Sequence, residues 1–313
     1  MIDLKPKSRQ ISSTVHRFAY RSGIGPLLAQ RLPGTRILMY HGTPRAAQSG
    51  FEKQIRFLKK HFDIVPLSEV PDSREQSRSK AATVALTFDD GLRNNLMIAY
   101  PVLASCGVPA TFFVCPGLIE SGKWLWNHEM RGRLRTLGSA CQLPALTKLG
   151  CSSNGTDATV EWMKSLPIAV RHRAEETIRE ATRTFNPSSE DKEHYDIMSW
   201  DDIRELDSSL ITIGSHTLSH PILPTLSESE RRCEIADSRK ILESKLGRTI
   251  DSFCYPNGSE NPAIVDEVSE VYRYAVTTQV GFAQSGTNLF LLPRVPAADA
   301  IEMLAWRMIR PAS

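Results

Sequence analysis

Short apolar runs of strand length alternate with amphipathic, helix-length stretches along most of the chain. This alternation is typical of parallel β-α-β units, in which a helix returns the chain to the same edge of a sheet. It predicts seven parallel strands, at Arg36–Tyr40, Thr83–Phe88, Thr111–Cys115, Leu210–Gly214, Ser252–Tyr255, Tyr274–Thr277 and Leu289–Leu292. The pattern therefore indicates an α/β protein with one barrel-like domain.

The helix-length stretches have well-marked starts. They lie at Phe51–His61, Asn94–Ser105, Trp200–Leu206 and Glu228–Leu246. The last two follow Ser-x-x-Asp and Ser-x-x-Glu sequences, in which serine and the acidic residue satisfy free backbone N–H groups of the first turn. Between residues 116 and 196 the alternation stops, apart from a helical stretch at Leu166–Phe185. We interpret this region as a long insertion after the third strand.

The composition is that of an ordinary globular protein. The chain has 313 residues, of which 41% are apolar and 23% charged, so it can bury a core without disulfides or a structural metal. No stretch approaches the ~18 consecutive apolar residues of a membrane-spanning helix, and the first residues lack a secretory signal. These features predict a cytoplasmic protein. Its six cysteines show no C-x-x-C spacing, and we expect reduced thiols.

Charge is balanced over the whole chain but not along it. The net charge of +3 from 38 basic and 35 acidic residues is too even to favour a nucleic acid partner. Through Arg36, however, seven basic residues face a single acidic one. We therefore divide the chain into a basic N-terminal arm, residues 1–35, and a barrel, residues 36–313. Ile11, Val15 and Phe18 share one helical face, which suits either peripheral contact of the arm with the inner membrane or a basic arm that caps the closed end of the barrel.

Two adjacent carboxylates follow the strand at residues 83–88. They are Asp89 and Asp90, and Gly91 comes next. The carboxyl ends of parallel strands form the edge where such folds place their sites. Neighbouring side chains of an extended segment point in opposite directions, so we expect different roles for the two acids. The same three residues are also compatible with an ordinary turn.

Two histidines follow another strand end. His216 and His220 are four residues apart, a spacing that places both imidazoles on one side of a helical turn and suits one divalent ion. Pro221 disfavours helical backbone at His220, so the turn is expected to be short. With one aspartate, the pair completes a two-histidine, one-carboxylate set. A divalent ion held in this way polarises a carbonyl and lowers the pKa of water to about 7.

Three further strand ends carry candidate residues. Tyr255 and Asn257 lie in a Tyr-Pro-Asn-Gly loop whose backbone N–H groups can face an oxyanion. His41 follows the first strand and Arg294 the last. In the insertion, Trp126 offers an indole face that suits either a sugar ring or the packing of the insertion against the barrel.

Taken together, these motifs resemble the polysaccharide deacetylase family, the NodB-like chitooligosaccharide deacetylase group of carbohydrate esterases. The matching segments, in family order, are Met39-Tyr40-His41-Gly42, Thr87-Phe88-Asp89-Asp90-Gly91, Ser215-His216-Thr217-Leu218-Ser219-His220-Pro221, Tyr255-Pro256-Asn257-Gly258 and Leu292-Pro293-Arg294. The resemblance implies a distorted (β/α) barrel of about seven strands. It also implies that Asp89 is the catalytic base, that the Asn257 backbone N–H binds the oxyanion, and that a zinc-type ion is held by Asp90, His216 and His220.

The sequence departs from the family pattern at two places. Many members have an arginine where Cys254 stands, which orients the catalytic aspartate, and a late Leu-x-Leu-His whose histidine protonates the leaving amine. Arg294 is our candidate for the missing charge and His41 for the missing acid. His128 and His194, both in the insertion, are the alternatives for the acid.

These observations predict a metal-dependent hydrolase that removes N-acetyl groups from amino sugars of a glycan or glycan precursor. The same site would also suit a deformylase or a cyclic amidase, and the two departures suit a glycan-binding barrel that has lost its chemistry. The segment Gly117–Lys123 matches a phosphate-binding G-x-x-x-x-G-K loop, but Trp124 stands where such a loop needs Ser or Thr for Mg²⁺.

Overall fold

The computed structural model describes residues 16–17, 20–73, 82–138, 143–153 and 155–310. Cys141 and the predicted apolar face Ile11, Val15 and Phe18 lie outside the described residues. The five described cysteines are all free thiols, as the sequence predicted, and Cys115, Cys151 and Cys254 are buried. No helix in the described part of the chain is both long enough and apolar enough to cross a bilayer.

Seven parallel strands close into a barrel, which confirms the predicted fold class. β1 pairs with β8 on one side and with β3 on the other, so the sheet has no open edge there. The barrel strands are β1 (Arg36–Tyr40), β3 (Thr83–Phe88), β4 (Ala110–Val114), β5 (Ile211–Ser215), β6 (Ser252–Cys254), β7 (Tyr274–Val280) and β8 (Leu292–Pro296). An eighth, two-residue strand, β2 (Asp63–Ile64), pairs with the start of β3.

The last strand lies further along the chain than the apolar pattern predicted. Leu289–Leu291 form a 3₁₀ turn that begins where the Asn288 side chain accepts a hydrogen bond from the Phe290 N–H. The strand starts only at Leu292. The prediction was wrong because this local cap competes with extended backbone. As a result, Arg294 lies inside β8 and not after it.

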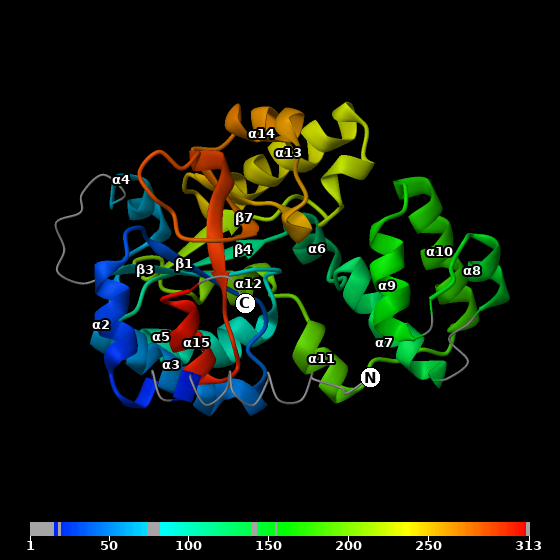
Figure 1. Ribbon diagram of the computed structural model, residues 1–313. Coiled ribbons are helices and arrows are strands. Elements are labelled where there is room, and N and C mark those ends of the chain that lie inside the picture. The colour runs from blue at the N-terminus through cyan, green and yellow to red at the C-terminus, as the bar shows by residue number, and fades with distance from the viewer. Residues whose placement is uncertain (1–15, 18–19, 74–81, 139–142, 154, 311–313) are drawn as a thin grey trace, which may run out of the picture.

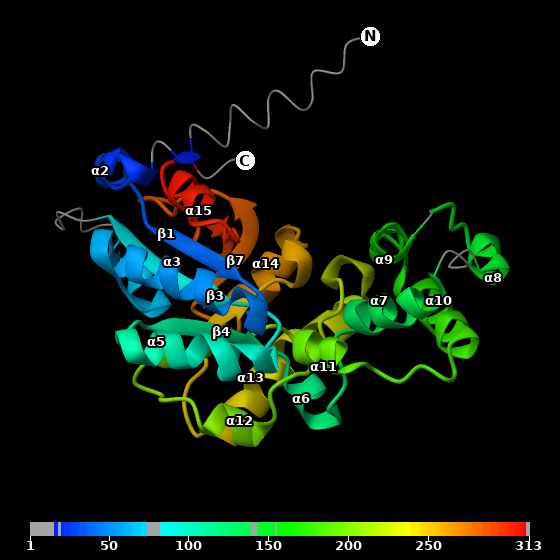
Figure 2. The same cartoon turned by 90° about the horizontal axis from the view of Figure 1, so that it is seen from below.

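Helices cover the outside of the barrel (Figures 1 and 2). They are α2 (Ile24–Arg31), α3 (Gln48–His61), α4 (Val70–Ser73), α5 (Tyr100–Cys106), α12 (Trp200–Arg204), α13 (Glu228–Leu246), α14 (Pro262–Ser269) and α15 (Ile301–Arg307). Both predicted capping boxes are present, with Ser199 bonded to Asp202 and Ser227 to Glu230. The stretch predicted at residues 94–105 starts as a π-helical segment, Asn95–Ala99, before α5 begins.

Between β4 and β5 the chain forms a helical region. It contains α6 (Pro116–Ser121), α7 (Trp126–Thr136), α8 (Pro144–Lys148), α9 (Thr156–Lys164), α10 (Ile168–Ala181) and α11 (Ser189–Tyr195). Helices α7 to α10 make a lobe beside the barrel, drawn in green in Figures 1 and 2. This lobe has its own apolar core, which includes Met130, Leu134, Val160, Met163 and Ile178. The G-x-x-x-x-G-K segment folds as α6 with Gly122 as its C-cap, and is therefore not a phosphate-wrapping loop.

Candidate active site

The Asp89-Asp90-Gly91 segment turns sharply at the end of β3. Asp90 has φ 72° and Gly91 has φ 64°, so two successive residues adopt left-handed backbone. This conformation is costly for Asp90, and such strain is typical of functional sites. A side chain at Gly91 would also lie 3.1 Å from Val114 Cγ1. The turn sends the two carboxylates to different partners.

Asp89 forms a buried, two-pronged ion pair with Arg294. The two guanidinium nitrogens Nη1 and Nη2 donate to Oδ1 and Oδ2, each at 2.7 Å, and the arginine side chain is fully buried. Nη2 also donates to Cys254 Sγ at 3.3 Å, so Arg294 reaches the place of the arginine that the family pattern has at Cys254. Burial alone would raise the pKa of Asp89, but the Arg294 guanidinium holds it below its usual value. Asp89 is therefore held ionised and in a fixed orientation.

Asp90 lies opposite the two histidines. Its Oδ1 is 3.6 Å from His216 Nε2 and 3.5 Å from His220 Nε2. All three side chains are buried, and their ligand atoms lie within 4.8 Å of one another. The spacing predicted a helical turn for the two histidines, and this was wrong: Thr217 and His220 both have positive φ, so the turn is not helical. Pro221 disfavours helical backbone at His220, and a hydrogen bond from the His220 N–H to Thr217 Oγ1 closes the turn.

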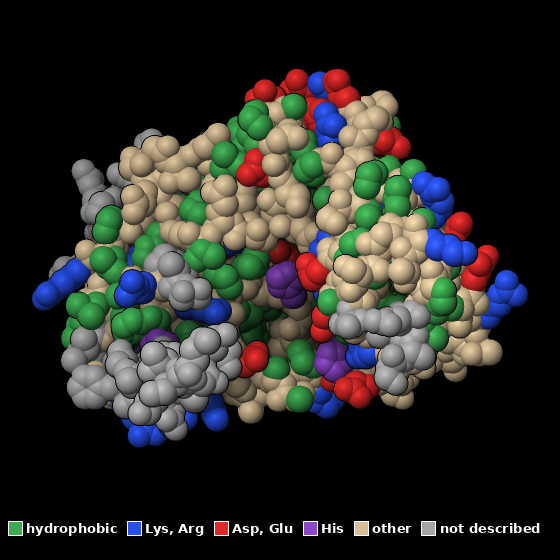
Figure 3. Space-filling view, turned by 45° about the vertical axis from the view of Figure 1, so that its right-hand side comes forward, with side chains coloured by type: hydrophobic (Ala, Val, Ile, Leu, Met, Phe, Trp, Pro, Cys, Tyr) green, Lys and Arg blue, Asp and Glu red, His purple; other side chains and the backbone are tan. Residues whose placement is uncertain are grey.

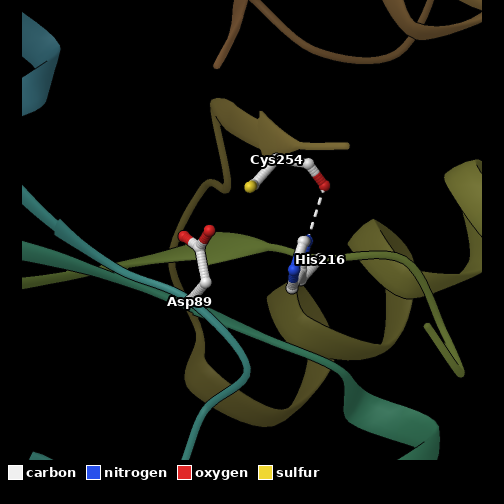
Figure 4. Close-up of side chains that lie close together, drawn as sticks. All are labelled: Asp89, His216 and Cys254. Carbon is white, nitrogen blue, oxygen red and sulfur yellow. Dashed lines mark hydrogen bonds between the residues drawn. The ribbon is translucent and has the colours of Figure 1, made fainter. Parts of the chain in front are cut away.

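The donor set of Asp90, His216 and His220 fits a divalent metal ion. His216 Nδ1 donates to the Cys254 carbonyl at 2.7 Å (Figure 4), an arrangement that leaves Nε2 as the ligand atom facing Asp90. Burial lowers the pKa of His220 to about 3, so its ring is neutral, the form that ligates metals. Burial also opposes charge on His216, yet Cys254 and Asp90 raise its pKa well above the usual value. The site thus favours a positive charge at this position.

The loop after β6 brings a third strand end to the same place. Tyr255 is buried and donates to the Phe290 carbonyl at 3.1 Å, which anchors the start of the loop. Asn257 is exposed and has φ 57°. The next residue must be glycine, since a Cβ at Gly258 would overlap Thr278 Oγ1 at 1.9 Å. This close approach keeps the loop against the end of β7.

These residues line one cavity of about 290 Å³. Its barrel side is formed by His41, Asp89, Asp90, His216, His220, Tyr255, Asn257 and Thr278. In Figure 3 a hollow lies between the barrel and the insertion, with histidine and acidic side chains at its edge. His41 is half exposed, and its Nε2 lies 3.9 Å from Asp89 Oδ2. His41 also borders a second, more open cavity of about 600 Å³ between the start of α3 and the segment after β8.

The opposite wall of the cavity comes from the insertion. It consists of Asn127, His128, Arg131 and Lys164. His128 Nε2 lies 4.0 Å from Asp90 Oδ2. Of these four residues, the sequence pointed only to His128. Asn127 and Arg131 are four residues apart and so share one face of α7, but nothing in the sequence singles out that face or Lys164.

Two residues named from the sequence lie away from the cavity. Trp126 is largely buried in the apolar core of the insertion, where the Arg171 guanidinium lies 4.6 Å from its ring centre. It therefore packs the lobe and does not line the cavity as a sugar platform. His194, a partly buried residue of α11, has its Nδ1 2.8 Å from the Glu190 carbonyl and is not among the residues around the cavity.

Comparisons with known proteins agree with this geometry. The family model described as Polysaccharide deacetylase matches residues 76–275. YxkH of Bacillus subtilis (strain 168), which is named after the same family, is 22% identical over 267 residues, covering 83% of this chain and 70% of that protein.

Solved structures share the fold. The deacetylase PplD of Streptococcus pyogenes, solved with acetate, superposes with a TM-score of 0.60 at 20% identity, covering 88% of this chain and 99% of that one. IcaB from Ammonifex degensii superposes with a TM-score of 0.58 at 19% identity, covering 89% of this chain and 98% of that one. The family model spans well over half of the chain and includes both the Asp89-Asp90 turn and the histidine pair. The chain therefore belongs to the polysaccharide deacetylase family, whose members are hydrolases that act on acetylated glycans.

Proposed function

We propose that this protein is a metal-dependent N-deacetylase of amino sugars in a glycan or glycan precursor. One observation carries the proposal: an ionised carboxylate, Asp89, fixed by Arg294, lies next to the buried Asp90, His216 and His220 set at one cavity. A base beside an electrophilic centre is what hydrolysis of an unactivated amide needs. The structural relatives of the chain, which include the deacetylase PplD, support the same reaction.

Each residue has a role in this proposal. Asp89 takes a proton from the attacking water, since its carboxylate is ionised and held in place. The Asn257 backbone N–H stabilises the oxyanion, and Tyr255 anchors its loop. His41, which is 3.9 Å from Asp89, protonates the leaving amine. His128, on the Asp90 side, is the other histidine that can reach it.

Asp90, His216 and His220 would hold the ion, and two nitrogens with one carboxylate favour Zn²⁺. The bound ion supplies a Lewis acid that polarises the amide carbonyl and makes water more acidic. The 600 Å³ cavity beyond His41 adds room for further sugars on one side of the acetylated one, which favours an oligosaccharide over a single sugar.

The test is acetate release from N-acetylglucosamine oligosaccharides by purified protein. We expect release in the presence of Zn²⁺, loss of activity with a chelator, and recovery when Zn²⁺ is added back. Asp89→Asn is the matched inactive control, because it keeps the shape of the site. If the protein releases formate from N-formylated sugars but no acetate from their acetylated counterparts, its activity is that of a deformylase and not of a deacetylase. Glycan binding without any product would leave a binding protein.

A further inference from the structure

The insertion presents two basic side chains to the cavity, Arg131 from α7 and Lys164 from the end of α9. Each side chain is only 22% exposed. An N-acetylated sugar is uncharged at its acetamide and hydroxyl groups, and the proposed reaction gives neither cation a role. Their position therefore needs another explanation.

Both cations form ion pairs with acidic residues on the solvent side of the insertion. Arg131 Nε donates to Asp157 Oδ1 at 3.1 Å, and Lys164 Nζ donates to Glu161 Oε1 at 2.8 Å. Asp157 and Glu161 are 85% and 58% exposed and are not among the residues around the cavity. Because a guanidinium has five N–H donors and an ammonium three, donors remain for a ligand in the cavity.

The carboxylates that line the cavity already have other partners. Asp89 is neutralised by Arg294, and Asp90 faces His216 and His220. Neither is paired with Arg131 or Lys164 in the described residues. An anionic ligand would thus meet two oriented cations without competing with the catalytic carboxylates, in a partly buried setting where charge-assisted hydrogen bonds are strong.

We infer that the substrate carries an anionic group, a phosphate ester or a carboxylate, next to the acetylated sugar, and that Arg131 and Lys164 bind it. The inference rests on the proposed function, because it places the acetamide at Asp89 and Asp90 and the anion toward α7 and α9. It makes the insertion the determinant of substrate choice. Neutral chitin-type oligosaccharides are then poor substrates.

The experiment compares three acetylated substrates. These are a neutral N-acetylglucosamine tetrasaccharide, a tetrasaccharide in which N-acetylglucosamine alternates with glucuronic acid, and N-acetylglucosamine 1-(methyl phosphate). The first has no charge, and the other two distinguish carboxylate from phosphate as the source of the anion. We expect at least one anionic substrate to have a KM roughly tenfold lower than the neutral one.

Variants assign that advantage to the two cations. Arg131→Gln with Lys164→Met should raise the KM of the anionic substrate roughly tenfold, with little change in kcat and none for the neutral substrate. Arg131→Lys with Lys164→Arg keeps both charges and should keep the preference. The matched control is Arg135→Gln on the same helix, because Arg135 donates to the Tyr195 hydroxyl and does not line the cavity.

The outcomes separate this inference from the proposed function. Acetate release with equal KM from all three substrates would overturn the inference and keep the deacetylase. An anionic preference that persists in the double variant, or that disappears equally in Arg135→Gln, would also overturn it. If no substrate releases acetate, calorimetry with Asp89→Asn decides. If the anionic sugar binds tightly and Arg131→Gln abolishes this binding, the anion site is supported and the deacetylase reaction is not. If neutral and anionic sugars bind equally, neither the anion site nor the deacetylase reaction is supported.

Discussion

The barrel and the helical insertion build the two walls of one cavity by different means. Barrel residues such as Asp89 and His216 sit at strand ends, are buried, and are fixed by bonds to Arg294 and to the Cys254 carbonyl. Insertion residues such as Arg131 and Lys164 project from helix faces and are held by exposed acids. The barrel wall is suited to chemistry that tolerates little movement. Side chains in the insertion wall can be substituted without disturbing that chemistry.

Substitution of a metal ligand should lower activity more than any other change, and all three candidate ligands lie in the barrel wall. Asp90→Ala, His216→Ala and His220→Ala each leave only two protein ligands, so we expect metal occupancy to fall sharply. The reaction rate should fall about 10³-fold or more, because the ion provides the main electrostatic stabilisation of the transition state. Elemental analysis of purified variants measures the occupancy. His128→Ala, on the insertion side at 4.0 Å from Asp90, is the matched histidine control and should keep the ion. Full occupancy in a ligand variant would contradict the assignment.

Asp89→Asn tests the base separately from the ion. The amide cannot accept the proton of water, so kcat should fall roughly 10²–10⁴-fold, while elemental analysis shows the metal still bound. Asp201→Asn on α12 provides the control, since its carboxylate is largely exposed and lies outside the cavity. An unchanged kcat at saturating substrate for Asp89→Asn would move the base to another residue, with His41 next in line.

Arg294→Met should shift the pH dependence of the reaction. At present Arg294 holds the pKa of Asp89 below its usual value against the opposing effect of burial. Without the guanidinium, burial loses its main counterweight and only the weaker influence of His41 and His216 opposes it, so the pKa of Asp89 rises and the base is protonated at a higher pH. The acidic limb of the pH–rate profile should therefore move to higher pH. Arg294→Lys keeps a charge and should move it less; an unmoved limb in Arg294→Met would make Arg294 purely structural.

The strand-end residues could be predicted from the sequence, whereas of the cavity residues in the insertion only His128 could. Asp89, Asp90 and the histidine pair follow apolar runs whose carboxyl ends must meet at one edge of a parallel barrel. Arg294 was named although its strand was placed three residues too early, because Asn288 caps a turn that the apolar pattern does not reveal. Its side chain still reaches Asp89 from inside β8.

Polar residues on helices carry no comparable signal. Asn127, Arg131 and Lys164 look like parts of ordinary solvated helix faces in the sequence. They reach the cavity only because the lobe packs beside the barrel mouth, and that packing depends on contacts distant in sequence. The same reason explains why the sequence left the role of Trp126 open between sugar binding and packing: its burial in the core of the lobe is not visible in the local pattern.

Trp126→Ala should separate the stability of the two regions. Removing a large, buried aromatic side chain costs about 3–5 kcal/mol, and the loss should fall on the lobe that its indole helps to pack. We expect hydrogen exchange to speed up in α7 to α10 and the KM to rise modestly, with metal occupancy unchanged. Equal loosening of the barrel strands would show that the two regions unfold as one unit and would weaken the comparison.

The smallest expected effect concerns the N-terminal side of the barrel, where we propose peripheral membrane contact. Leu27 and Leu28 on α2 are exposed, and the basic residues of the arm precede and follow them in sequence. Each basic residue near an anionic surface contributes about 1 kcal/mol, and exposed leucines add apolar contact. Arg36 donates to the Ala29 and Leu32 carbonyls, so point substitutions disturb the barrel less than truncation does.

We therefore expect Leu27→Ser with Leu28→Ser to reduce sedimentation with anionic vesicles several-fold, without changing the reaction. Binding to neutral vesicles should be weak for both proteins, and binding to anionic vesicles should fall as salt is raised, because surface charges are screened. Met97→Ser is the matched control, since Met97 is an exposed apolar side chain on the π-helical segment before α5. Equal, salt-insensitive partitioning of the wild type and the double variant would remove the membrane contact. The arm would then be a basic extension with no part in where the enzyme meets its substrate.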